Sequence, residues 1–190
     1  MGSLTEEQKS ILIGCLLGDG AMRKKKNALL EINHCFAQKS LVDWKLSKFA
    51  GLVNTLPKKR NGNGNRVAYR FVTRSLPVLT PFYDWFFLNK KKIIPIDLKL
   101  TPLSIAVWFM DDGSKSYSSV YLNTQQFTMD EQRNLINCLR EQFGLESRLN
   151  KEKTYFRIRL LTQSSKKFVN LIEPYILKEF RYKLPNSNLS

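Results

Sequence analysis

The sequence predicts a mixed α+β chain made of two similar halves, each with an antiparallel sheet. Two apolar helical segments, residues 12–20 and 105–113, end alike in Asp-Gly. Each is followed by a similar series of short alternating strands and amphipathic helices. About half of the chain separates Asp19 from Asp112. The pattern indicates an internal duplication, with one carboxylate at the same place in each copy.

In the first half, Thr5 followed by two glutamates is typical of a helix start. This helix is expected to run to about residue 18 or 19, and Gly20 is expected to stop it. The later elements are read from period-two or helical spacing: a hairpin at 23–26 and 29–36, a helix at 39–53, a basic turn at 58–65, a strand at 66–74 and a helix at 77–87.

The second half repeats this order after a linker at 89–100. A helix at 102–111 is expected to end at Gly113, and Thr128 caps a helix through residue 143 that Gly144 stops. A hairpin, strands at 146–151 and 155–160, and a helix at 165–177 complete the half. The predicted division is therefore 1–88 for the first half, 89–100 for the linker and 101–190 for the second half.

Composition limits the function. The 190 residues carry a net charge of +15 with a pI near 9.9, which favours a polyanionic partner. Three cysteines form no metal spacing or disulfide pattern, so we expect a reducing intracellular compartment; organelle or bacterial cytoplasm stays open. A single histidine, His34, argues against zinc catalysis and Ser/Cys-His triads. No membrane span or signal peptide is predicted.

The two equivalent carboxylates, Asp19 and Asp112, are the sharpest candidates for chemistry. Gly14 and Gly18 lie on one helix face and permit close approach of the two motif helices, which would bring the carboxylates together. Neighbouring carboxylates repel unless a cation or a proton intervenes, and their hard oxygens suit Mg²⁺. The alternative is that each aspartate merely begins a turn.

These motifs, with residues 89–95, 122–128 and 182–186, resemble the LAGLIDADG homing endonucleases in their single-chain, two-motif form. The likeness is to the branch containing the mitochondrial omega-intron endonuclease. It implies two αββαββα halves whose sheets form a saddle in the DNA major groove. It also implies Mg²⁺-dependent cutting of long sites with four-base 3′ overhangs. Val107 and Asp111 depart from the usual small residues, so we expect an asymmetric helix interface.

The resemblance assigns roles residue by residue. Asp19 and Asp112 are the expected metal ligands, with Gly18 and Asp111 as further candidates, for Mg²⁺ or for Mn²⁺ or Ca²⁺ in its place. Lys92 and Lys183 are expected beside the reacting phosphates. The polar faces and turns supply the predicted DNA contacts, which are Arg23, Lys25, Glu31, Asn33, Arg60, Arg66, Arg70, Arg74, Lys115, Tyr121, Asn123, Gln125, Arg148, Lys151, Arg157 and Arg159.

The function that follows from the resemblance is a site-specific double-strand DNA endonuclease acting as a monomer on an asymmetric target. Two rivals share its fold. One is an RNA-binding maturase that assists intron splicing, with intron RNA as its partner. The other is a DNA-binding regulator with an inert site, against which both carboxylates and both lysines weigh.

Overall fold

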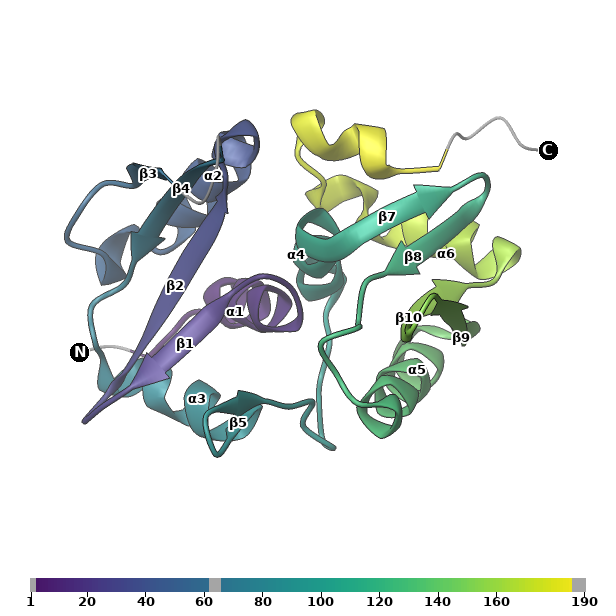
Figure 1. Ribbon diagram of the computed structural model, residues 1–190, viewed down its shortest axis with the longest axis horizontal. Coiled ribbons are helices and arrows are strands. Elements are labelled where there is room, and N and C mark those ends of the chain that lie inside the picture. Colours follow the sequence, from purple (N-terminus) through teal and green to yellow (C-terminus); the bar gives the residue numbers. More distant parts are fainter. Residues whose placement is uncertain (1–2, 62–65, 186–190) are drawn as a thin grey trace.

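The protein is described by a computed structural model at residues 3–61 and 66–185. Figure 1 shows two halves side by side, with helices α1 (Glu6–Leu17) and α4 (Pro102–Asp112) between them. Each half follows the order helix, two strands, helix, two strands, helix. The predicted fold class, mixed α+β with two pseudo-symmetric αββαββα halves, is confirmed.

The first half continues from α1 with strands and helices close to the predicted positions. They are β1 (Ala21–Lys24), β2 (Ala28–Cys35), α2 (Lys39–Lys48), β3 (Lys58–Asn61), β4 (Val67–Val72) and α3 (Thr80–Phe86), with 3-10 turns at Phe36–Gln38, Ala50–Leu52 and Pro77–Leu79. The described strands pair antiparallel in the order β1-β2-β4-β3. The predicted basic turn is wrong at its start, because Lys58–Asn61 form an edge strand beside β4. Residues 62–65 lie outside the described residues.

A short hairpin lies in the connection between the halves. It consists of β5 (Phe87–Leu88) and β6 (Lys91–Lys92), joined by Asn89 and Lys90. Both turn residues have positive φ, 50° and 66°, as two-residue hairpin turns with the right twist require. This turn reverses the chain and directs Lys92 toward the end of α1.

The second half mirrors the first. It contains α4, β7 (Gly113–Ser116), β8 (Ser119–Leu122), α5 (Met129–Phe143), β9 (Ser147–Glu152), β10 (Tyr155–Leu160) and α6 (Thr162–Ile172), with 3-10 turns at Glu173–Tyr175 and Lys178–Lys183. Its sheet order within the described residues is β7-β8-β10-β9, again antiparallel. Gly144 ends α5 in the left-handed conformation at φ 60°, as its sequence position predicts.

Local capping explains where three of the helices begin. Thr5, Thr101 and Thr128 each accept a hydrogen bond from the third residue of the helix, and the side chain of that residue bonds back to the cap. These reciprocal bonds satisfy backbone donors that have no partner inside a helix. The starts of both motif helices are therefore fixed by local sequence.

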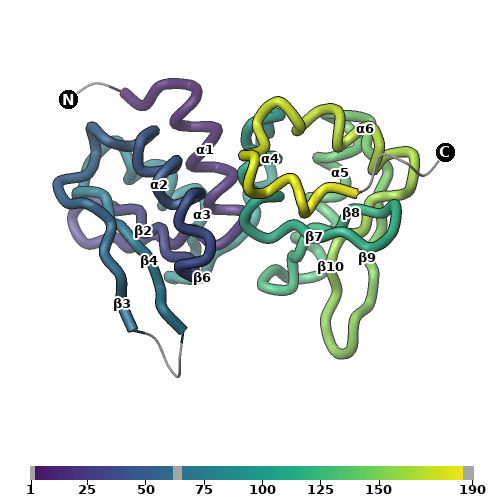
Figure 2. Tube along the Cα trace, turned by 90° about the horizontal axis from the view of Figure 1, so that it is seen from above, coloured from purple at the N-terminus to yellow at the C-terminus, as the bar shows by residue number. Residues whose placement is uncertain are grey.

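The two sheets present one face each on the same side of the molecule. In Figure 2, β3 with β4 and β9 with β10 extend in one direction, away from the helices. Alternate residues of β2 and β10 are buried against the helices, as at Ile32 and Ile158. The intervening polar residues form the outer faces. No helix in the described part of the chain combines the length and apolar character needed to cross a membrane.

Candidate functional site

The two motif helices cross at unusually close range. A Cβ atom added at Gly14 would lie 2.7 Å from Cβ of Val107, and one added at Gly18 would lie 2.6 Å from Cβ of Asp111. Gly14 in α1 and Gly18 at its C-cap therefore leave the space that the side chains of Val107 and Asp111 in α4 occupy. The interface is asymmetric, as expected from the two departures in the second motif.

This crossing brings the two predicted catalytic carboxylates into one cavity. Asp19 follows the last turn of α1, and Asp112 is the last residue of α4. Both line a cavity of about 410 Å³ that also includes Lys92, Asn123 and Gln125. The side chain of Asp19 is 45% exposed, so a ligand can reach it from solvent. The structure therefore places Asp19 and Asp112 in the same cavity, as the motif spacing predicts.

Each predicted catalytic lysine is held against the end of a motif helix. Nζ of Lys92 donates to the carbonyl oxygens of Gly18 and Gly20, at 2.9 and 2.8 Å. Nζ of Lys183 donates to those of Met110 and Asp111, at 2.6 and 3.1 Å. An ammonium group at this position satisfies free carbonyl groups and opposes the negative end of the helix dipole. Burial lowers the pKa of both lysines.

The equivalent carboxylates differ in charge state. Burial, followed by the nearby charges of Asp19 and Asp111, raises the pKa of Asp112 to about 7. The pKa of Asp19 is lowered, chiefly by the neighbouring His34. Nδ1 of His34 lies 3.4 Å from Oδ2 of Asp19, which is long for a hydrogen bond, and Nδ1 forms no hydrogen bond within the described residues. Near neutral pH, Asp19 is therefore ionised and Asp112 is partly protonated.

A buried charged cluster lies directly behind these carboxylates. Nζ of Lys45, on α2, is 2.5 Å from Oδ1 of Asp111 and 3.2 Å from Nε2 of His34. The side chains of Lys45 and Asp111 are 0% exposed. Burial is the largest single influence on Lys45 and acts against its charge, but Asp111, Cys15 and Asp19 together outweigh burial, so the pKa of Lys45 is raised. Cys15 borders this cluster, and burial raises its pKa to about 12.

The prediction of Asp111 as a metal ligand is wrong for its side chain. That carboxylate is paired with Lys45 in the interior, and its backbone carbonyl accepts from Lys183. Gly18 offers only its carbonyl oxygen, which already accepts from Lys92. Lys45 was not predicted from the sequence, although its spacing indicated it. Lys45 lies four residues from Leu41 and four from Phe49, on the apolar face of the helix, and the structure buries all three side chains fully.

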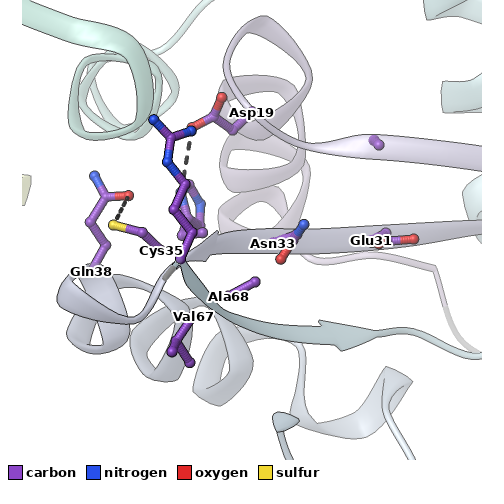
Figure 3. A pocket seen from close by; sticks show the side chains of 10 residues that line it. Asp19, Glu31, Asn33, Cys35, Gln38, Val67 and Ala68 are labelled. Atoms are coloured by element: carbon purple, nitrogen blue, oxygen red, sulfur yellow. Dashed lines mark hydrogen bonds and ion pairs between the residues drawn. The ribbon is translucent and has the colours of Figure 1, made fainter. Parts of the chain in front are cut away.

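The polar face of the first sheet carries paired charges beside Asp19. Arg23 and Arg70 both contact Glu31, Arg70 at 2.9 Å from Nη1 to Oε1. Figure 3 shows Asn33 and Glu31 along β2, in a cavity of about 590 Å³ that Asp19 also lines. Arg66 borders the same cavity, and Arg60 lies opposite Ala68, which also borders it. Lys25 lies exposed in the turn after β1.

The polar face of the second sheet places two arginines over a tyrosine ring. The guanidinium carbons of Arg157 and Arg159 lie 4.2 and 5.8 Å from the ring centre of Tyr121. Arg157 also contacts Asn123 at 3.4 Å and Glu152 at 2.6 Å. Arg148 pairs with Arg159 across the strands. These contacts hold the arginines in fixed positions before any ligand arrives.

Three predicted DNA contacts are not on these faces. Lys115 pairs with Val120 on the buried side of β7–β8 and donates to the carbonyl of Leu184. Lys151 pairs with Phe156, one residue out of phase with Arg157. Arg74 lies beyond β4 and donates to the carbonyl of Gly51. Because neighbouring strand residues point to opposite faces, a register error of one reverses the assignment.

Two residues that were not predicted take places on the polar faces. Lys58 lies opposite Arg70 in the first sheet. Asn150 lies opposite Arg157 in the second. Both are identified by the pairing register, which the local sequence of one strand does not fix.

Comparison with known proteins agrees with this arrangement. The LAGLIDADG DNA endonuclease family matches residues 9–168, a span that contains most of α1, all of α4 and both four-stranded sheets. The chain belongs to this family.

Individual relatives sharpen the assignment. The chain is 33% identical to the probable intron-encoded endonuclease 1 of Wickerhamomyces canadensis, over 96% of the chain and 85% of that relative. It is 29% identical to cytochrome b mRNA maturase bI2 of Debaryomyces hansenii, over 96% of the chain and 75% of that relative. The structure of the homing endonuclease I-WcaI bound to its DNA recognition sequence superimposes with a TM-score of 0.91 at 31% identity. That match covers 98% of this chain and 89% of the other.

Proposed function

We propose that this protein is a homing endonuclease that cuts both strands of a long, asymmetric DNA site with the help of a divalent cation. The observation that carries the proposal is the pairing of Asp19 with Asp112 in one cavity between two arginine-bearing sheet faces. The family and the DNA-bound relative I-WcaI support the same reading.

The donor chemistry of the cavity fits a hard divalent cation. Two carboxylates supply oxygen ligands. The pKa of Asp112 is raised by burial and then by the nearby charges of Asp19 and Asp111, and a bound cation would offset those charges. We propose Mg²⁺ as the working ion, with Mn²⁺ or Ca²⁺ able to occupy the same positions. When bound, such an ion supplies an activated water and stabilises the leaving oxygen of the phosphodiester.

The remaining residues bind and orient the DNA. Lys92 lines the cavity, and Lys183 is held at the end of α4, where its positive charge acts on Asp112. On the sheet faces, arginines suit guanine, and Asn33, Asn123 and Gln125 suit adenine. Because one chain carries both carboxylates, we propose a monomer on one duplex, with different half-sites and 3′ overhangs of four bases.

The deciding experiment is cleavage of a randomised duplex library with Mg²⁺, followed by sequencing of the cut ends. The proposal expects one long motif with uniform 3′ overhangs, no cutting in EDTA, and a one-to-one complex in sedimentation. It also expects affinity to fall with salt by a slope of about −0.9 per phosphate contact. Absence of cleavage, or two chains per duplex, would contradict it.

A second function, intron maturation, is favoured by one specific observation. The maturase of Debaryomyces hansenii matches 96% of the chain. Measuring the splicing of candidate introns with and without the protein would test this role. Asp19→Asn is the control: it should keep any splicing activity, because a maturase does not need the carboxylates that cut DNA.

A further inference from the structure

His34 is a buried side chain whose two ring nitrogens face different charged groups. Nε2 lies 3.2 Å from the ammonium of Lys45, and Nδ1 lies 3.4 Å from Oδ2 of Asp19. The histidine side chain is 1% exposed. It therefore connects the buried pair of Lys45 and Asp111 to a carboxylate that reaches solvent.

The chemistry of Lys45 decides which nitrogen of His34 bears the hydrogen. An ammonium group has three donors and no acceptor, so Nε2 of His34 must accept from it. Oδ1 of Asp111, at 2.5 Å, holds the ammonium in place. The hydrogen of the neutral ring is then on Nδ1, the nitrogen that lies 3.4 Å from Oδ2 of Asp19. Nδ1 forms no hydrogen bond within the described residues, so it is a buried donor without a partner, and the carboxylate of Asp19 lies 3.4 Å from it.

The second half lacks this arrangement. Counting from Asp19 and Asp112 through the paired strands, Thr124 takes the place of His34. Its hydroxyl donates to Gln132, whose amide donates to the carbonyl of Phe127. Leu135 corresponds to Lys45 when both helices are counted from their N-caps. This network is neutral and closed, and none of its bonds reaches Asp112.

We propose that His34 is a positioning residue for Asp19, with Lys45 and Asp111 fixing the ring so that Nδ1–H holds one carboxylate oxygen. The other oxygen then remains available to a cation in the cavity. A hydrogen bond of this kind fixes a ligating carboxylate and commonly changes cation affinity or activity by about 10–100-fold. The inference rests on the proposed function. It adds that the two carboxylates are oriented by different means, so the two DNA strands depend unequally on His34.

Two substitutions at residue 34 separate the ring nitrogens. In His34→Asn the amide NH₂ can occupy the place of Nδ1, whereas in His34→Gln the amide group reaches the place of Nε2 and leaves Nδ1 empty. Thr124→Val serves as the matched control, because it disturbs the equivalent buried position in the other half.

The experiment measures nicking of each strand separately in a supercoiled plasmid carrying the target, together with a Ca²⁺ titration of the protein–DNA complex. His34→Gln is expected to slow one strand by about 10–100-fold, to accumulate DNA nicked in the other strand, and to shift the Ca²⁺ midpoint about tenfold upward. His34→Asn should recover most of both. Thr124→Val should leave the ratio of the two strand rates unchanged.

Several results would overturn the proposal. Equal slowing of both strands by His34→Gln, or no difference between His34→Gln and His34→Asn, would mean that Nδ1–H has no special role. A Ca²⁺ midpoint that does not move would mean the same. If the unchanged protein bound a duplex selected from the library but did not cut it, the proposed function would fail, while the Ca²⁺ comparison of the two variants on that duplex would still decide the role of His34.

Discussion

The two halves repeat one backbone plan but differ in their interiors. Arg70 and Arg157 occupy equivalent strand positions, and each lies beside an asparagine on a polar face. Behind the catalytic cavity, the first half has a buried charged cluster of Lys45 and His34, joined to Asp111 from the other half. The second half has the neutral pair of Thr124 and Gln132 at that depth. Similar folds can therefore support equivalent carboxylates by unlike chemistry.

The helix crossing explains how this difference is accommodated. At the contact of Gly18 with Asp111, only one of the two helices can carry a side chain, because an added Cβ at Gly18 would lie 2.8 Å from Oδ2 of Asp111. The side chain that is present passes into the first half and meets Lys45. Gly18 and Asp111 are equivalent positions of the two motifs, but only Asp111 carries a side chain, and that side chain forms the ion pair between the two halves.

The largest expected effect is loss of one catalytic carboxylate. Asp19→Asn and Asp112→Asn are each expected to abolish detectable double-strand cleavage, because each removes a charged oxygen ligand from the cavity. Binding to the target in EDTA should be largely retained. Strand-resolved gels would show which strand each half serves. If either variant cut both strands at the normal rate, the aspartate that it replaces would not be catalytic.

The next effect concerns the charged cluster. Lys45→Met is expected to destabilise the protein by roughly 3–5 kcal/mol, because it leaves the carboxylate of Asp111 buried without a partner. The double variant Lys45→Met/Asp111→Asn should regain much of that loss. In the second half, Gln132→Leu should cost only about 1–3 kcal/mol, since it frees neutral groups. Urea unfolding monitored by circular dichroism measures all three. Equal costs for Lys45→Met and Gln132→Leu would contradict the contrast between the halves.

A third prediction compares the equivalent arginines. Arg70→Ala and Arg157→Ala are each expected to weaken target binding by roughly 1–3 kcal/mol and to relax specificity at one base position, on opposite sides of the cut. The measurement is binding to a panel of single-base variants of the target. Arg74→Ala is the control, because its guanidinium bonds the carbonyl of Gly51. If both variants weakened all sequences alike, the arginines would be phosphate contacts.

The smallest effect is a pH dependence that separates the two carboxylates. The folded pKa of Asp112 is raised from 3.8 to about 7, so the folded state holds a proton that the unfolded chain releases. This contribution is complete below about pH 4 and is lost as pH rises through 7. Without divalent cations, Asp112 should lower the free energy of unfolding by about 2–3 kcal/mol between pH 5 and pH 8.

Asp19 does not obscure this measurement. Its folded pKa is lowered, so its contribution is present above the unfolded value of 3.8 and is lost only as pH falls below it. The contribution of Asp19 is therefore constant between pH 5 and pH 8, and the part of the slope that Asp112→Asn removes is the part due to Asp112. Asp112→Asn should flatten the slope, and Asp19→Asn should also reduce it, because the charge of Asp19 helps to raise the pKa of Asp112. A slope unchanged in Asp112→Asn would assign the proton to another group.

Much of the secondary structure could be predicted from neighbouring residues. The cap at Thr5 and the α5 limits at Thr128 and Gly144 depend on hydrogen bonds that span only a few positions, and the structure has them where expected. Strand faces followed from alternation wherever apolar residues marked the buried side, as in β2. The two Asp-Gly motifs identified the carboxylates because each motif is a contiguous helix end.

The errors arose where the answer depends on a distant partner. Lys58–Asn61 looks like a turn in the sequence, yet it pairs with β4 because that strand offers a free edge. Lys151 and Lys115 lie on the opposite sheet face from Arg157 and Tyr121, which the sequence of one strand does not reveal, since a strand's face depends on its register with its neighbour.

By itself, the sequence determined the duplication, the order of elements and the two carboxylates, because these depend on local periodicity and on residues adjacent in the chain. Only the tertiary structure decided what surrounds them. The pairing of Lys45 with Asp111 joins positions 66 residues apart, and a buried charge is stable only where the fold supplies its partner. The difference in pKa between Asp19 and Asp112 also comes from the tertiary structure, because a carboxylate's pKa depends on its burial and on the charges around it.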